Sequence, residues 1–290
     1  DRNKRLESRE LTRLRRQSQD CKCYTLKIDE NHLNSVQRNF LHMSFLEAKW
    51  FYNYALSQTN IFDSSIRKVN SVVVKKLEEF EERELKYISS QMKTGLHERI
   101  GSAIKMLSTK KKQGYFDKVG RLKFKKEVKS IELKQYGITW KFDKTRIKIQ
   151  GLKKPLKVEG LNQIPENIEF ANAKLIRKPS GYYIQITTFQ NKVDKKLTGK
   201  KVGLDFGIKD SIVTSDGEKF SIKIPETCRL KRLQLFFAKK KKGSRNWHKC
   251  LWKIKKEYEK ISNQKQDQVN KLVSYLKNNY DEICIQDEMI

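Results

Sequence analysis

The chain has 290 residues, with 64 Lys and Arg against 34 Asp and Glu, a formal net charge of +30. This length predicts two or three compact units, and the excess of positive charge indicates a polyanionic partner, nucleic acid first, with a merely basic protein as the alternative. No stretch approaches 18 consecutive apolar residues, and the first twenty residues are strongly charged. We therefore expect a cytoplasmic protein without a signal peptide, a membrane span or a membrane partner.

The cysteines and histidines do not form a metal-binding pattern. The five cysteines include no C-x-x-C pair, and none of the four histidines stands at ligand spacing from another histidine or a cysteine. This argues against a disulfide framework and against a four-cysteine zinc site. Zinc is not expected within residues 1–290.

The N-terminal segment, residues 1–20, is a basic arm with arginine at dense helical spacing and few apolar positions. Because it offers little surface to bury, we expect it to order only on nucleic acid. The next segment alternates Tyr24, Leu26 and Ile28 with polar residues, which predicts a half-buried strand.

Two long helices are predicted next. Apolar residues recur at three or four positions, or multiples of these, through residues 31–57, which predicts an amphipathic helix whose aromatic stripe faces a core. A second helix is expected over residues 90–107. It is followed by a basic run of three residues that we expect to contact nucleic acid, Lys110, Lys111 and Lys112.

From residue 120 the sequence changes to short alternating runs separated by Gly, Pro, Asn or Asp. Evenly spaced short strands predict a β-barrel or a sandwich. The expected organisation is a barrel built from residues 21–30 and 116–198, with residues 31–115 inserted as a helical lobe.

Residues 199–290 show a different sequence pattern from the two preceding regions. A short strand contains Val202, Leu204 and Phe206, and an Asp216-Gly217 turn predicts a hairpin. Two helices follow, over residues 228–241 and 246–277, and the chain then enters a final apolar strand that ends in acids.

Asp205 is the candidate catalytic acid. Since Val202, Leu204 and Phe206 share one face of the strand, Asp205 projects from the opposite face, beside glycines that leave its surroundings open. Cleavage of phosphodiesters with two metal ions requires carboxylates that converge on ions roughly 3.5 to 4 Å apart, and adjacent strands can supply them. An Asp that merely caps a turn is the alternative.

A family resemblance adds to this interpretation. The run G-L-D-F-G-I-K-D, followed by T-S-D-G, resembles the first RuvC motif of the TnpB/OrfB family, transposon-encoded RNA-guided nucleases related to type V CRISPR effectors. The basic segment 230–247 and the segment 260–267 are similar to that family's helix-turn-helix and to the helix before its second RuvC motif. Segments 49–56 and 111–125 resemble its helical recognition lobe and the return into its barrel.

The resemblance implies an α+β multidomain fold: a wedge-like, oligonucleotide-binding barrel with an inserted recognition lobe, followed by an RNase H-like (RuvC) α/β domain over residues 199–290. It implies a Mg²⁺-dependent DNA endonuclease, with a guide RNA and target DNA as partners. Asp205 carries over as a metal ligand. The side chains expected on nucleic acid are Lys239, Lys240, Lys241, Lys242, Arg245 and Trp247, with a solvated basic face as the alternative.

The final strand departs from the family pattern. The family commonly places Glu-Asp-Leu there, and this chain has Gln286, Asp287 and Glu288. Gln286 is a poor ligand for a hard cation, and Glu288 shares its face but lies about 6.6 Å further along the strand. We expect Glu288 to serve as the second catalytic and metal-binding acid through a shift of register, with Gln286 marking an inactive site as the alternative.

The family's third acid and zinc ribbon follow this strand, and the sequence given ends at Ile290. We expect either a longer protein or a form that cannot cut. Three functions therefore remain open: a guided endonuclease, a nuclease-dead guided repressor of transcription, and a guide-free nucleic-acid-binding protein.

Overall fold

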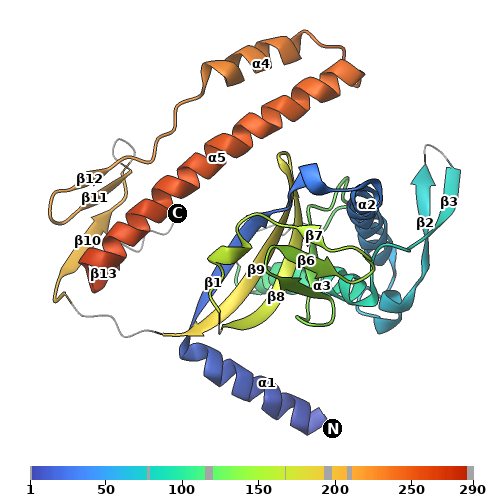
Figure 1. The fold of residues 1–290 in the computed structure, drawn as a ribbon, viewed down its shortest axis with the longest axis horizontal. Coiled ribbons are helices and arrows are strands. Elements are labelled where there is room, and N and C mark those ends of the chain that lie inside the picture. The colour runs from blue at the N-terminus through green and yellow to red at the C-terminus, as the bar shows by residue number, and fades with distance from the viewer. Residues whose placement is uncertain are drawn as a thin grey trace. The chain divides into compact units, whose positions relative to one another are not determined.

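The computed structural model describes residues 2–76, 79–114, 120–166, 168–192, 198–207 and 211–285. The chain forms two compact units, Asp1–Lys192 and Val193–Ile290, here called the N-terminal unit and the C-terminal unit. Figure 1 shows the elements of each.

The N-terminal unit is built around an antiparallel sheet of four strands in the order β1-β9-β8-β4. These strands are β1 (Gln19–Lys27), β9 (Gly181–Asn191), β8 (Glu169–Lys178) and β4 (Ser130–Leu133). Tyr24 and Leu26 on β1 are buried, and they pair with Ile186 and Ile184 on β9. The predicted strand at Tyr24 is confirmed, and it is the edge strand of this sheet.

A second, three-stranded sheet comprises β5 (Trp140–Asp143), β6 (Arg146–Ile149) and β7 (Leu156–Lys157). It meets the first sheet through a single β-bridge between Ile28 and Val158, which is formed by two backbone hydrogen bonds. None of the sheets formed by the described residues closes into a barrel. The described residues therefore do not form the closed barrel expected from the short strands, because among them strand pairing between the two sheets stops after this bridge.

Two helices cover the sheets and share their core: α2 (Ser35–Ser57) and α3 (Ser90–Lys112). The helix predicted from residue 31 begins at Ser35, because Asn34 and Gln37 form a capping box and Glu30–His32 is a short 3₁₀ turn (η1). Helix α3 extends beyond the predicted end to Lys112.

Glu47 on α2 ties the two helices together. Its carboxylate is buried and accepts hydrogen bonds from the backbone N–H groups of Lys86, Tyr87 and Ile88, just before α3. Burial raises the pKa of this carboxyl. Between α2 and α3 lie η2 (Ser64–Lys68) and the ribbon of β2 (Ser71–Lys76) and β3 (Glu79–Glu84); η3 (Leu161–Gln163) follows β7.

The N-terminal arm is helical in the structure, as α1 (Arg2–Gln17). Arg15 and Arg16 both pair with Glu169 on β8, at 2.9 and 3.2 Å, and the Arg16 guanidinium lies 4.3 Å from the centroid of the Phe189 ring on β9. The expectation that this arm stays unstructured is therefore wrong for residues 2–17, since a helix satisfies the backbone locally and these contacts hold its last turn.

The C-terminal unit has a mixed sheet in the order β12-β11-β10-β13. It contains β10 (Lys201–Asp205), β11 (Ile212–Thr214), β12 (Lys219–Phe220), α4 (Cys228–Ala238), α5 (Arg245–Asn279) and β13 (Glu282–Ile285). Strand β13 pairs in parallel with β10, and the other pairs are antiparallel. Both predicted helices, the hairpin and the final strand are confirmed.

Helix α5 joins two small cores within this unit. Leu272 and Leu276 pack on the sheet, and Cys250 and Ile254 pack against Leu230 of α4. Figure 1 shows α5 as the longest helix, running from α4 to the sheet. Neither α5 nor any other helix in the described part of the chain has the length and apolar character needed to cross a membrane.

Candidate active site and nucleic-acid interface

Asp205 is the last residue of β10, and its side chain is exposed. Val202 and Leu204 are 2% and 7% exposed and pack in the sheet's small core, so the predicted alternation is confirmed for these two residues. Asp205 therefore projects from the face opposite that core. It pairs with Val213 of β11 on one side. Phe206, predicted on the same face as Val202 and Leu204, is 52% exposed, because β10 ends at Asp205.

The carboxyl end of strand β13 lies at the same edge of the sheet as Asp205. Because β10 and β13 are parallel, their carboxyl ends meet at one edge, which is where open α/β sheets commonly bind ligands. The register pairs Leu204 with Ile285 and Gly203 with Cys284. Asp205 thus lies one residue beyond Leu204, the last β10 residue that the structure pairs with β13.

Glu288 and Gln286, the two alternatives for the second ligand position, lie outside the described residues. Within the described residues, no group of three or more His, Cys, Asp or Glu side chains is placed to hold a metal ion. The geometry therefore places one carboxylate at the edge where the two strands end. An exposed carboxylate of this kind is a suitable oxygen ligand for Mg²⁺.

The opposite end of the sheet holds acids of a different kind. In the hairpin between β11 and β12, Asp216 accepts a hydrogen bond of 2.7 Å from the Tyr280 hydroxyl, and Glu218 accepts from Tyr275 at 2.7 Å. These hydrogen bonds raise the pKa of both tyrosines. Since Thr214 lies opposite Leu204 and Ser215 bonds to Gly203, the hairpin turn points toward the start of β10. This pair of contacts therefore lies away from Asp205 and holds the hairpin against the end of α5.

The connection between α4 and α5 and the start of α5 carry most of the predicted nucleic-acid contacts. An ion pair of 3.0 Å between Arg229 and the buried Glu257 joins the helices, beside the core of Leu230 and Ile254. The predicted contacts Lys239, Lys240, Lys241, Lys242 and Arg245 are exposed at the connection and at the start of α5.

The Trp247 side chain is less exposed than its predicted role in nucleic-acid binding requires. Its ring is half-buried, 5.0 Å from the Phe237 ring and 4.9 Å from the His248 ring. Its backbone N–H bonds to Ser244, which caps α5. Trp247 thus helps to join the two helices, and only part of its ring faces solvent.

A basic stripe on α5 was missed. Lys249, Lys253, Lys256 and Lys260 are all exposed and follow one another at intervals of four, three and four residues. Such intervals keep side chains on one face of a helix. The spacing is visible in the sequence and could have identified the stripe once the helix was assigned.

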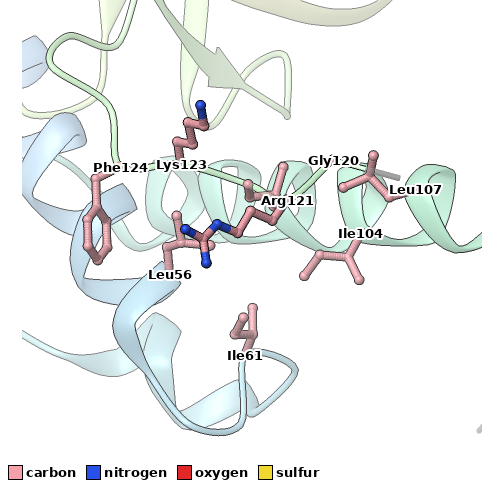
Figure 2. Close-up of a pocket in the computed structure, with 9 residues that line it drawn as sticks. Leu56, Ile61, Ile104, Leu107, Gly120, Arg121, Lys123 and Phe124 are labelled. Atoms are coloured by element: carbon pink, nitrogen blue, oxygen red, sulfur yellow. The ribbon is translucent and has the colours of Figure 1, made fainter. Parts of the chain in front are cut away.

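The remaining predicted contacts, Lys110, Lys111 and Lys112, form the last turn of α3 and are exposed. Near this end of the helix, a groove of about 710 Å³ is lined by Leu56, Ile104, Leu122 and Phe124, among others. Figure 2 shows the Arg121 side chain lying across the groove. No carboxylate or histidine is among the described residues that line it, so it offers apolar contact and positive charge without acid–base groups.

Comparison with known proteins bears on the C-terminal part of the chain. Residues 184–287 match the family OrfB_IS605, described as a probable transposase, and the resemblance to the TnpB/OrfB family is thereby confirmed. The match runs from β9 through both helices to the end of β13 and includes Asp205. No curated protein matches the chain.

Proposed function

Because residues 184–287 belong to the OrfB_IS605 probable-transposase family, we propose that the protein is an RNA-guided DNA endonuclease of the TnpB type. In this proposal the chain binds a guide RNA from a transposon end and cuts complementary DNA next to a short adjacent motif. The observation that carries the proposal is the exposed Asp205 at the edge where the parallel strands β10 and β13 end.

Asp205 is proposed as one ligand of Mg²⁺, and Glu288 as the second. Carboxylate oxygens suit this hard cation, and a bound Mg²⁺ would stabilise negative charge on the scissile phosphate. Asp205 fits this role because its carboxylate is exposed and, among the described residues, forms no hydrogen bond or ion pair. Glu288 is assigned from the sequence alone.

The basic surfaces of the C-terminal unit support a nucleic-acid partner. The α5 stripe from Lys249 to Lys260 spans twelve residues, about 16.5 Å of helix axis. One strand of a duplex carries a phosphate about every 3.4 Å of its axis, so the stripe is long enough to follow several phosphates. Lys239, Lys240, Lys241, Lys242 and Arg245 extend this surface around the connection between the helices.

The test is cleavage by the chain purified from cells that also express the transposon-end RNA. Asp205→Ala and Glu288→Ala are expected to lower Mg²⁺-dependent cutting of guide-complementary DNA at least about a hundredfold, since each removes a metal ligand. Glu282→Gln is the matched control. It removes an acid from the same strand pair, but one that is paired with Lys201 at the other end of β10, and it should cut like the unaltered chain.

Each outcome separates the candidate functions. Cutting by Asp205→Ala at the unaltered rate would show that the assigned site is wrong. Guided binding of target DNA without any cutting would instead identify the nuclease-dead repressor. If sequencing finds no defined RNA with the purified chain, the guide-free reading applies.

A further inference from the structure

A groove of about 560 Å³ lies between α1 and β9 in the N-terminal unit, and none of its lining residues belongs to the candidate site or to the predicted nucleic-acid contacts. It is lined by Arg9, Arg13 and Arg16, by Thr12 of the same helix, and by Phe189 of β9. We call it the arginine groove.

The arginines of this groove stand in register along α1. They are separated by four and three residues, which places them on one helix face over about 10 Å of helix axis. In the sequence, Arg2 and Arg5 continue the same spacing toward the N-terminus. The spacing therefore extends over almost the whole helix.

The charges differ in how they are compensated. Arg16 is half-buried, lies over the Phe189 ring and pairs with Glu169, so it is held in place from two sides. Arg9 and Arg13 are exposed, and no acidic side chain pairs with either among the described residues. Two guanidinium groups four residues apart repel each other on an isolated helix.

Beyond the last turn, where Arg15 and Arg16 contact the sheet, this arrangement does little to hold α1 in place. A helix of 16 residues with few tertiary contacts is only marginally stable in water, and like charges at this spacing lower its stability further. An anion bound between the arginines would reverse that effect. Guanidinium groups bind phosphate oxygens through paired hydrogen bonds, which makes phosphate a well-matched anion.

We propose that the arginine groove binds the sugar-phosphate backbone of a nucleic-acid strand, with phosphates on Arg9 and Arg13. The occupant follows from charge and length. A strand of duplex carries a phosphate about every 3.4 Å of its axis, so about three phosphates fit the described stripe. Arg16, fixed by Phe189 and Glu169, is the positioning residue that sets the end of the groove. The proposal rests on the nucleic-acid partner of the proposed function and not on cleavage, because no residue of the groove belongs to the nuclease site.

The test measures nucleic-acid affinity of the full chain as a function of salt concentration. Arg9→Gln/Arg13→Gln is compared with Lys4→Gln/Lys153→Gln, which removes the same two charges from exposed positions that do not line the groove. Each lost phosphate contact lowers the slope of log affinity against log salt by about one. The groove variant is expected to lose about two in slope and at least about tenfold in affinity, and the control to lose little of either.

Parallel measurements with duplex RNA, duplex DNA and single-stranded RNA of equal length identify which strand the groove takes. Circular dichroism checks that each variant keeps the helix content of the unaltered chain. Equal losses in the two double variants, or no loss in the groove variant, would overturn the proposal. So would groove-dependent binding of polyglutamate or of anionic lipid vesicles without any change in nucleic-acid binding.

Discussion

The two units bury their apolar residues in different ways. In the N-terminal unit, α2, α3 and three sheets share one connected core, which includes Phe51, Leu96 and Trp140. In the C-terminal unit, the buried residues form two small clusters at different positions along α5. Between Ile261 and Leu272, every α5 residue is exposed or half-buried and most are polar.

This difference indicates a division of roles. A single large core resists local opening, whereas small separate cores open at lower free energy. In the C-terminal unit the surface that does not pack carries the candidate site: Asp205, the strand end at Ile285, and the lysine stripe of α5. The N-terminal unit has a rigid core, and its arginine groove lies at the periphery, on α1.

The largest expected effect is in the N-terminal core. Phe51→Ala removes a fully buried ring and should lower the free energy of unfolding of this unit by about 4 kcal/mol, through lost burial and the cavity left behind. Hydrogen exchange read by mass spectrometry would show faster exchange through α2, α3 and the sheets, with β10 to β13 unchanged. Phe80→Ala, at a 73% exposed position, is the control and should change little. Faster exchange in both units would refute the independence of their cores.

A smaller effect is expected where α5 meets the hairpin. Tyr280→Phe removes the hydrogen bond to Asp216 and should loosen the hairpin from the end of α5, because the hydroxyl donates to a carboxylate at the edge of a small core. Hydrogen exchange should rise in β11 and β12 and not in α4. Tyr275→Phe is the matched control, because Tyr275 donates to the carboxylate of Glu218 but is only half-buried, and this variant should have a smaller effect. Equal effects of the two variants would mean that burial of Tyr280 contributes nothing to this contact.

The smallest effect concerns the solvent-exposed middle of α5. Asn263→Gly and Asn263→Ala differ only in helix propensity at an exposed position, by about 1 kcal/mol. The glycine variant should show faster hydrogen exchange around residue 263, with protection kept at Ile254 and Leu276. Loss of protection at both of these positions would show that the two small cores unfold together and would remove the contrast between the units.

Much of the secondary structure follows from local pattern. Apolar residues at three- and four-residue intervals predicted α2, α3 and α5 to within a few residues, and the Asp216-Gly217 turn predicted the hairpin. Capping accounts for the shifted start of α2, since Asn34 and Gln37 satisfy the first backbone N–H groups. Period-two alternation also predicted the exposed face of Asp205.

Other features depend on which segments meet in space. The barrel was wrong because the number and spacing of strands do not specify whether the outer strands pair, and here the sheets share one bridge. The groove could not be found from the sequence because Phe189 is 173 residues from Arg16 along the chain. The link between Tyr280 and Asp216 spans 64 residues in the same way.

The sequence by itself determined the charge of the protein, its helices and most of its strands, and the face from which Asp205 projects, because each depends on residues close together in the chain. Only the tertiary structure decided that β13 pairs in parallel with β10, that Trp247 is half-buried, and that the α1 arginines face Phe189. The physical reason is that these features come from packing and pairing between segments distant in the sequence. The spacing of residues within one segment does not predict which other segment it contacts.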